Sequence, residues 1–211
     1  MYNNEKAAVL KFCRRMLARG LTRGSGGNIS VRIPGKDLIA ISGSGIDYEE
    51  MTEDDVVVTD MNGNIIDGCV KPSSELPMHI ACYRVRPDAG AVVHTHSTYC
   101  TTIACLRRPL RNVSYMVAFA GESVECLPFY QIGSQELADN GAAALKDRNA
   151  VLLGNHGLLA VGSNIENAFA VAEEIELAAE LDYRTFLAGG GVELTAEDLA
   201  PLVQSFKTYV K

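Results

Sequence analysis

Ala91-Val92-Val93-His94-Thr95-His96 is the stretch that decides the fold, an apolar run that ends in two histidines. A short, β-branched run of this kind predicts a buried strand. Side chains two residues apart in a strand point to the same face of the sheet, so His94 and His96 can bind one ion together. Two neutral imidazoles gain little from lying side by side except a shared cation, and the pair therefore indicates a metal site.

A third histidine lies in a similar setting. Residues 151–153 form another apolar run, which Gly154-Asn155-His156-Gly157 follows. Three imidazoles with one position left open are the arrangement of a catalytic metal rather than a structural one, so the three histidines predict a metalloenzyme. The fourth, His79, falls in the middle of a predicted helix. We expect it to be structural or half-exposed, without a catalytic task.

Strands and helices alternate along the rest of the chain. Helical spacing of apolar residues predicts helices over 3–19, 74–84, 98–106, 134–146, 164–187 and from 195 onward. Apolar runs and turn signals predict strands over 28–33, 38–42, 56–59, 65–66, 90–94, 150–153 and 158–161. Interleaved helices together with hairpins favour a mixed sheet covered by helices over a purely parallel one. No linker divides the chain, so residues 1–211 are expected to form one domain.

Composition and charge restrict the partners. The chain has 47% hydrophobic residues and a net charge of −7, which is typical of a globular protein and argues against binding to nucleic acid. No apolar run is long enough to span a bilayer, and charges throughout the first residues argue against a signal peptide. The six cysteines are scattered without a Cys-x-x-Cys pair, as in a cytoplasmic protein with reduced thiols.

Three polar loops could bind an anion. Residues 24–28 and 42–45 are rich in glycine and could turn backbone amides toward a phosphate, although neither matches a P-loop or a dinucleotide fingerprint. Pro72-Ser73-Ser74-Glu75 enters a helix, where free amides and two hydroxyls could hold a phosphate and Glu75 could act as a base near the metal. The alternative is an ordinary capped helix with Glu75 at the positive end of its dipole, and the residue pattern alone favours this alternative.

Taken in order, five motifs resemble those of the class II aldolase/adducin family of sugar-phosphate enzymes, over nearly the whole chain. The motifs are Ser25-Gly26-Gly27-Asn28, Ser42-Gly43-Ser44-Gly45, Lys71-Pro72-Ser73-Ser74-Glu75, His94-Thr95-His96 and Asn155-His156-Gly157. The resemblance implies an α/β fold, a single three-layer domain whose mixed, mostly antiparallel β-sheet is covered by helices on both faces.

The same resemblance implies a zinc-dependent aldehyde-lyase. Its Zn²⁺ would be held by His94, His96 and His156, with Glu75 as a displaceable fourth ligand and as the base that moves a proton. The phosphate of a sugar-phosphate substrate would be held by residues of the three loops, namely Gly27, Asn28, Ser44, Gly45, Ser73 and Ser74.

The resemblance also implies a homotetramer whose active sites lie between subunits. Tyr115 would reach into the site of the neighbouring subunit and exchange a proton with the departing aldehyde oxygen. Tyr209 would close the site from the C-terminal tail.

Within the family, residues 114–118 and 206–209 are most similar to the L-fuculose-1-phosphate aldolases. This likeness implies cleavage of a ketose 1-phosphate to dihydroxyacetone phosphate and L-lactaldehyde. Ile132 departs from the pattern, because those enzymes carry an aromatic side chain at this position, and the aldehyde preference therefore stays open.

Two alternatives remain on the same scaffold. The first is L-ribulose-5-phosphate 4-epimerase or a related sugar-phosphate aldolase or dehydratase. The epimerase shares the bond-breaking step, but its pattern has Asp at the position of Glu75 and a further Asp in a segment where this chain has none between Leu110 and Ala120. This difference favours an aldolase. A non-catalytic module like the adducin head domain would lack the metal ligands, and all of them are present.

Overall fold

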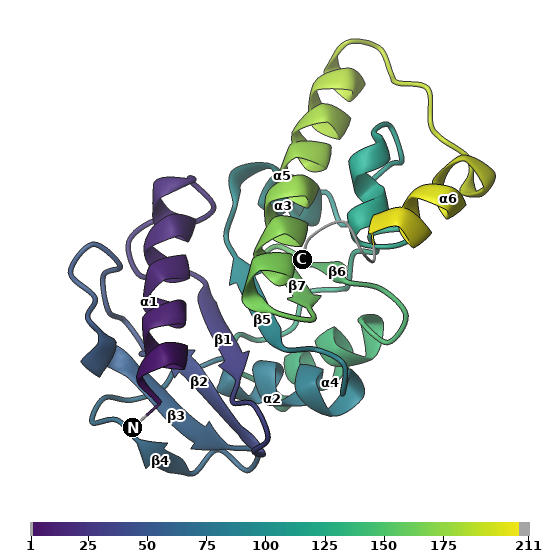
Figure 1. Ribbon diagram of the computed structural model, residues 1–211. Coiled ribbons are helices and arrows are strands. Elements are labelled where there is room, and N and C mark those ends of the chain that lie inside the picture. The colour runs from purple at the N-terminus through teal and green to yellow at the C-terminus, as the bar shows by residue number, and fades with distance from the viewer. Residues whose placement is uncertain (1, 207–211) are drawn as a thin grey trace.

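The computed structural model describes residues 2–206, which are built around one seven-stranded sheet with the order β4-β3-β2-β1-β5-β7-β6 (Figure 1). Its strands are β1 (Asn28–Arg32), β2 (Leu38–Ser42), β3 (Val56–Asp60), β4 (Ile65–Asp67), β5 (Ala91–Thr95), β6 (Ala150–Leu153) and β7 (Gly157–Gly162). All six strand pairs are antiparallel, and the described residues add one isolated parallel bridge between Cys126 and Leu152. The mixed, mostly antiparallel sheet is confirmed.

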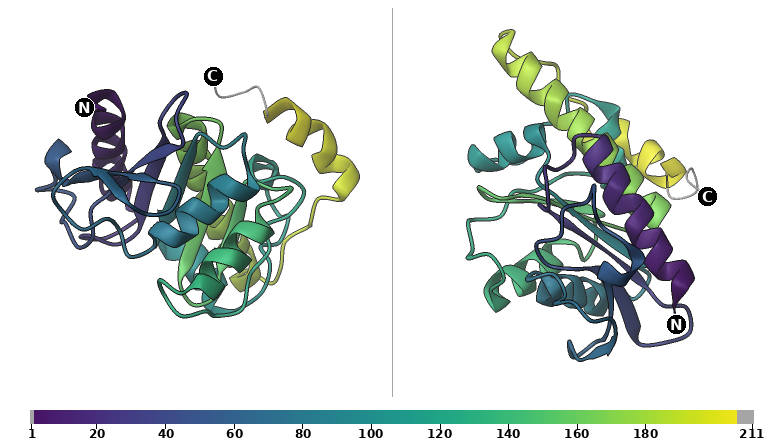
Figure 2. Two further views of the ribbon diagram at one scale, coloured as in Figure 1. Left: turned by 90° about the horizontal axis from the view of Figure 1, so that it is seen from below. Right: turned by 90° about the vertical axis from the view of Figure 1, so that its left-hand side faces the viewer.

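Helices cover both faces of this sheet. They are α1 (Asn3–Ala18), α2 (Leu76–Val85), α3 (Thr98–Cys105), α4 (Gln135–Ala144), α5 (Ile165–Leu187) and α6 (Ala196–Phe206), with short 3₁₀ helices η1 (Glu53–Asp55) and η2 (Tyr115–Phe119). Figure 2 shows α1 and α5 on one side of the sheet and α2 and α4 on the other. The C-terminal helix α6 packs against η2.

Two apolar cores result from the alternation of side chains along the strands. In β5, Ala91 and Val93 belong to the core shared with α1, α3 and α5, whereas Val92 belongs to the core shared with α2 and α4. Because side chains alternate between the faces, His94 lies on the same face as Val92, toward α2. The strand therefore directs His94 toward the N-terminal end of that helix, where its Nε2 lies 3.2 Å from Glu75 Oε2.

The predicted elements are confirmed with small shifts at their ends. The helix expected from residue 74 begins at Leu76, because Glu75 is its N-cap and Pro77 lies in its first turn. β5 ends at Thr95, so His96 lies just beyond the strand. The sequence does not predict η1 or η2, since three to five residues are too few to show a helical period.

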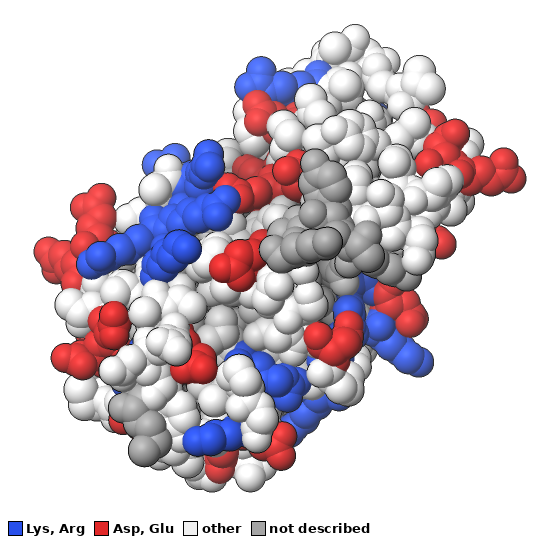
Figure 3. All heavy atoms as spheres, in the orientation of Figure 1, with Lys and Arg blue, Asp and Glu red and all other residues white. Residues whose placement is uncertain are grey.

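Ion pairs join the two long helices on one side of the sheet. Basic side chains gather over the C-terminal half of α1 (Figure 3), where Arg15 and Arg19 both contact Glu173 of α5 at 2.6 and 3.2 Å.

Of the helices that the structure describes, none combines the length and apolarity required to cross a membrane.

Candidate metal centre

Three separate parts of the fold meet at one cluster of four side chains. Glu75 caps α2, His94 is the last residue but one of β5, His96 follows the strand, and His156 lies in the turn between β6 and β7. One nitrogen of each imidazole and one oxygen of Glu75 all lie within 4.8 Å of one another. Glu75, His94 and His156 are buried, whereas His96 is exposed, so the cluster is open to solvent on one side.

A tight turn sets the position of His156. Asn155 has a left-handed backbone with φ +56°, which asparagine tolerates better than most residues, and its Oδ1 accepts a hydrogen bond from Arg107 Nε at 2.6 Å. A Cβ atom at Gly157 would lie 2.1 Å from the carbonyl oxygen of Thr95. Glycine is therefore required where this hairpin approaches β5.

Distances within the cluster match those between neighbouring ligands of a tetrahedral metal. His94 Nε2 lies 3.0 Å from His96 Nε2 and 3.2 Å from Glu75 Oε2, and His156 Nε2 lies 3.6 Å from Glu75 Oε1. Metal–nitrogen bonds of 2.0–2.1 Å in a tetrahedral zinc site place neighbouring ligand atoms about 3.3 Å apart. The four side chains are therefore already spaced to surround one ion.

The imidazoles of the cluster are neutral near pH 7. Burial lowers the pKa of His94 to about 3, and burial also lowers the pKa values of His96 and His156. His94 Nδ1 donates to the carbonyl oxygen of Leu158 at 2.9 Å, so the lone pair of Nε2 points into the cluster. A neutral ring with a free nitrogen is the form in which histidine binds a metal.

Buried polar atoms without hydrogen-bond partners give a second test of fit. Among the described residues, Glu75 Oε1 and both ring nitrogens of His156 are buried and have no such partner. Leaving polar atoms of this kind unsatisfied is unfavourable by about 1–3 kcal/mol each. A divalent cation would satisfy the atoms that face the cluster, and three imidazoles with one carboxylate are a donor set that suits zinc.

Glu75 is held in a defined orientation. Its Oε2 accepts a hydrogen bond from Asn28 Nδ2 at 2.9 Å, and its backbone N–H donates to Ser73 Oγ at 3.2 Å. Asn28 is directly opposite His94 in the antiparallel pair of β1 and β5. Strand register therefore places the amide of Asn28 beside the carboxylate.

The three glycine- and serine-rich loops lie together next to the cluster. The backbone N–H groups of Ser44 and Ser73 donate to the carbonyls of Lys71 and Ser42, which joins the second and third loops. Tyr48, three residues beyond the second loop, donates its hydroxyl to the carbonyl of Gly27 in the first loop at 2.7 Å. The structure thus brings together the segments that contain the residues predicted to bind phosphate. Of these, Gly27, Asn28 and Ser73 are buried, and the other three are exposed, namely Ser44, Gly45 and Ser74.

The remaining predicted residues either lie apart from the cluster or fall outside residues 2–206, which the structure describes. Tyr115 is 49% exposed on η2, and its ring contacts Phe206 at 6.4 Å between centroids. Tyr209 lies outside the described residues. Ile132 is 52% exposed, and a Cβ at the adjacent Gly133 would lie 3.2 Å from the carbonyl oxygen of Ser74. Ile132 is therefore close to the third loop in the chain fold.

His79 is a residue of the site that the sequence pattern did not predict. It is fully buried, so a half-exposed position was wrong, and its Nε2 lies 2.6 Å from Asn28 Oδ1. A signal was present, because Glu75 and His79 are four residues apart and such residues share one face of a helix. That spacing alone could not show whether the shared face is turned toward water or toward the sheet.

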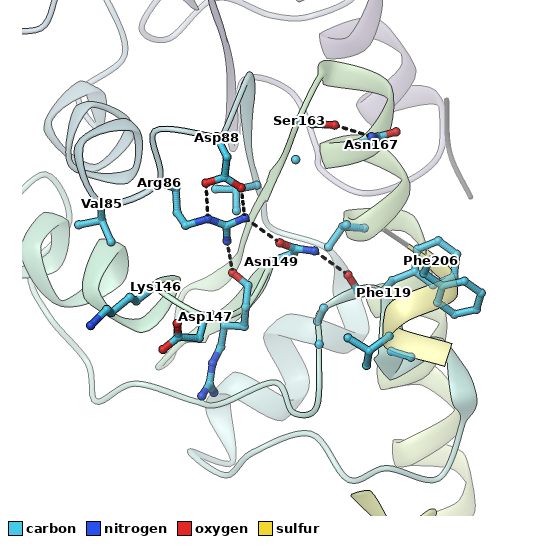
Figure 4. A pocket seen from close by; sticks show the side chains of 18 residues that line it. Val85, Arg86, Asp88, Phe119, Lys146, Asp147, Asn149, Ser163, Asn167 and Phe206 are labelled. Atoms are coloured by element: carbon cyan, nitrogen blue, oxygen red, sulfur yellow. Dashed lines mark hydrogen bonds and ion pairs between the residues drawn. The ribbon is translucent and has the colours of Figure 1, made fainter. Parts of the chain in front are cut away.

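A cavity of about 620 Å³ lies elsewhere, between the α2–β5 connection and the C-terminal part (Figure 4). None of the four cluster residues lines it. Arg86 on its wall already donates to Asp88 and to the carbonyls of Leu145 and Arg148, so it has a structural task. Cavity size therefore does not locate the functional site, whereas the donor set does.

Gly27→Ala is expected to damage the cluster through the backbone. Gly27 has φ +66°, and a Cβ there would lie 2.5 Å from the carbonyl oxygen of His94. We expect a loss of roughly 2–4 kcal/mol in unfolding free energy together with weaker metal binding. Gly24→Ala is the matched control, because Gly24 has φ +55° in the same loop with no atom within 4 Å. Urea unfolding and metal titration measure both variants, and equal effects would contradict the clash.

The fold and the cluster together define a class of protein. A helix-covered antiparallel sheet that gathers three neutral imidazoles and one carboxylate at a solvent-facing site is an arrangement suited to a metal-dependent enzyme.

Comparison with known proteins gives the family. The family model described as "Class II Aldolase and Adducin N-terminal domain" matches residues 7–183 of this chain. A 5-deoxy-D-ribulose 1-phosphate aldolase of Bacillus thuringiensis serovar kurstaki is 44% identical over 209 residues, which are 99% of this chain and 98% of that protein. An L-fuculose phosphate aldolase of Escherichia coli K12 is 41% identical over 203 residues, 95% of this chain and 93% of that protein. The chain belongs to the class II aldolase and adducin family.

A solved structure agrees with this assignment. An L-fuculose 1-phosphate aldolase superposes with a TM-score of 0.93 at 42% sequence identity, over 97% of this chain and 96% of that one. The fold inferred from the sequence resemblance is thereby confirmed.

Proposed function

We propose that this protein is a zinc-dependent aldolase that splits a ketose 1-phosphate between C3 and C4 into dihydroxyacetone phosphate and a short aldehyde, with residues 1–211 acting as one domain. The observation that carries the proposal is the convergence of His94, His96, His156 and Glu75 beside three glycine- and serine-rich loops. A zinc ion bound by these side chains would act as a Lewis acid that draws electron density from the ketose oxygens.

Glu75 is the proposed base. Asn28 holds its Oε2, while Oε1 has no hydrogen-bond partner among the described residues and is available to move the proton at C3, delivering it to the enediolate after cleavage and accepting it in the reverse reaction. A general base must lie within hydrogen-bond reach of the proton that it moves. Because Asn28 holds the Glu75 carboxylate through Oε2 only, Oε1 stays free for this proton transfer.

The loops are proposed to hold the substrate phosphate at Gly27, Asn28, Ser44, Gly45, Ser73 and Ser74. Their position beside the cluster supports this role, because backbone amides in glycine-rich loops bind anions. A phosphate fixed at C1 orients the bond between C3 and C4 over the cluster, and orientation of this kind can contribute several kcal/mol to lowering the barrier.

We further propose a homotetramer with shared active sites. Tyr115 is half-exposed and is not part of the cluster of its own chain, which supports a role in the site of a neighbouring subunit. There it would take the proton of the C4 hydroxyl as the bond between C3 and C4 breaks and the aldehyde forms, and return it to the aldehyde oxygen in the reverse reaction. Tyr209 is proposed to close the site.

A cytoplasmic location is proposed because all six cysteines are free.

Two substrates are candidates, and their aldehydes differ in length. L-Fuculose 1-phosphate would give L-lactaldehyde, with three carbons. A 5-deoxypentulose 1-phosphate would give acetaldehyde, with two carbons. The 44% identical relative named for 5-deoxy-D-ribulose 1-phosphate supports the second, and the superposed L-fuculose 1-phosphate aldolase supports the first. Ile132, beside the third loop, is proposed to take part in this choice.

A substrate panel tests the proposal. Purified protein is mixed with L-fuculose 1-phosphate, 5-deoxy-D-ribulose 1-phosphate and L-ribulose 5-phosphate, and dihydroxyacetone phosphate and aldehyde are measured separately. Release of both products in equal amounts from a ketose 1-phosphate is expected. Conversion of L-ribulose 5-phosphate to its C4 isomer without aldehyde release would instead indicate an epimerase. Lack of turnover with the whole panel, together with lack of bound metal, would indicate a non-catalytic module.

Tyr115→Phe is expected to lower kcat by roughly 100-fold and to leave KM within about twofold, because the hydroxyl moves a proton in the transition state but does not bind the phosphate. Tyr99→Phe is the control, since its hydroxyl lies 3.3 Å from Arg184 on α5. Steady-state kinetics on both variants decide the matter. A Tyr115→Phe enzyme with normal kcat would remove this residue from the reaction.

A further inference from the structure

A continuous chain of hydrogen bonds runs from Glu75 into the core between α2 and β1. Asn28 Nδ2 lies 2.9 Å from Glu75 Oε2, and Asn28 Oδ1 lies 2.6 Å from His79 Nε2. His79 Nδ1 lies 2.7 Å from Ser30 Oγ, which in turn lies 2.8 Å from the hydroxyl of Tyr83. All five residues are buried.

The spacing of these residues explains how two elements build one chain. Glu75 at the N-cap of α2 is followed every four residues by His79 and Tyr83 in the helix, and Asn28 and Ser30 are two apart on β1. Four residues of helix rise about 6.0 Å and two residues of strand about 6.8 Å, so the two rows stay in step. Polar side chains from helix and strand therefore alternate in an otherwise apolar interface.

One assignment of protons satisfies the whole chain. The Glu75 carboxylate can only accept, so the Asn28 amide must donate with Nδ2 and accept with Oδ1. His79 then donates from Nε2 and accepts at Nδ1, because burial lowers its pKa to about 3 and keeps the ring neutral. Ser30 donates to that nitrogen and accepts from the hydroxyl of Tyr83. Each donor thus has one acceptor.

We propose that His79 is a positioning residue, whose Nε2–H group fixes the orientation of the Asn28 amide and thereby holds the Glu75 carboxylate with Oε1 turned to the reacting centre. Ser30 and Tyr83 select the tautomer of His79 that this task requires. The inference rests on the proposed function, because it concerns the residue proposed there as the base. A polar chain with every partner satisfied restricts its members to one arrangement, whereas a flipped Asn28 amide would turn its oxygen toward the carboxylate.

Two substitutions of similar volume separate positioning from packing. His79→Gln keeps a side-chain N–H group that can reach Asn28, and His79→Leu fills the space without any donor. We expect His79→Leu to lower kcat by roughly 10- to 100-fold with KM and bound metal within about twofold of the wild type. His79→Gln is expected to retain kcat within about fivefold. A purely structural role would lower the melting temperature of His79→Leu without this division between kcat and KM.

Smaller substitutions of residues in the hydrogen-bond chain test the same idea if His79→Leu does not fold. Tyr83→Phe removes one hydroxyl, and Ser30→Ala removes the donor that selects the tautomer. We expect a graded loss of kcat, larger for Ser30→Ala than for Tyr83→Phe, since Ser30 is the closer of the two to Glu75. Unchanged kcat in Ser30→Ala, or equal losses in His79→Leu and His79→Gln, would overturn the proposal.

A readout without turnover keeps the two proposals distinct. In a crystal structure of metal-loaded His79→Leu, we expect the Asn28 amide to turn and its hydrogen bond to Glu75 to lengthen or break. The proposed function fails if the wild type cleaves no ketose 1-phosphate. The positioning role fails if Asn28 and Glu75 keep their wild-type arrangement in that crystal structure, whatever the activity of the wild type.

Discussion

Glu75→Gln is expected to lower kcat by about 10³-fold while the protein continues to bind a divalent cation and phosphate. The amide oxygen of glutamine can accept the hydrogen bond from Asn28 Nδ2 that Oε2 accepts now at 2.9 Å, so the side chain keeps its place. The amide nitrogen would then replace Oε1, and it cannot accept a proton. Loss of a positioned general base lowers turnover by roughly 10²–10⁴-fold, and the expected value lies within this range.

The measurements for this variant separate chemistry from binding. Metal content and the affinity for inorganic phosphate are expected to stay close to wild type, because three imidazoles and the loops are untouched. Glu50→Gln makes the same chemical change at an exposed position and is expected to be neutral. A Glu75→Gln enzyme that turns over at a near-normal rate would exclude Glu75 as the base.

Removal of the divalent cation by a chelator is expected to abolish cleavage, and addition of zinc is expected to restore it. The Nε2 atoms of His94 and His96 lie 3.0 Å apart and His94 Nε2 lies 3.2 Å from Glu75 Oε2, which is close to the spacing of ligand atoms around one ion. A cation that binds these atoms only in the folded protein stabilises the fold. At 100 times its dissociation constant it adds about 2.7 kcal/mol, which raises the melting temperature by roughly 5–10 °C.

Activity, melting temperature and metal content should change together in this titration. His96→Ala is the matched variant, because it removes the exposed ligand and leaves the buried ones in place. We expect it to need a much higher zinc concentration for activity. Cleavage that persists after complete removal of metal, or a substrate adduct trapped by borohydride, would refute the metal-dependent mechanism.

The helices and strands followed from the sequence because their signals are local. In Ala91 to Val93, the side chains alternate between the two faces of the sheet because of the strand geometry of near neighbours. The Asn62-Gly63 turn between β3 and β4 is decided within four residues, and Gly63 has φ +84°. The pairing of His94 with His96 was predictable for the same reason. His96 lies one residue beyond the strand, yet its ring still reaches the cluster.

The partners of those two histidines depended on long-range contacts. Asn28 meets His94 because β1 pairs with β5 across more than sixty residues of chain, and Glu75 reaches both because α2 packs on that face. No local period encodes the strand order. Only the resemblance to known family motifs linked these positions beforehand.

The sequence by itself determined which segments form the long helices and the strands, to within a few residues at their ends, and it indicated that three histidines could form a metal centre. Only the tertiary structure decided that His79 is buried and hydrogen-bonded to Asn28. The helical period placed His79 on one face with Glu75 but could not assign that face to water or to the core. The reason is physical: propensity and periodicity depend on near neighbours, whereas burial and hydrogen-bond partners depend on which distant segment packs against that face.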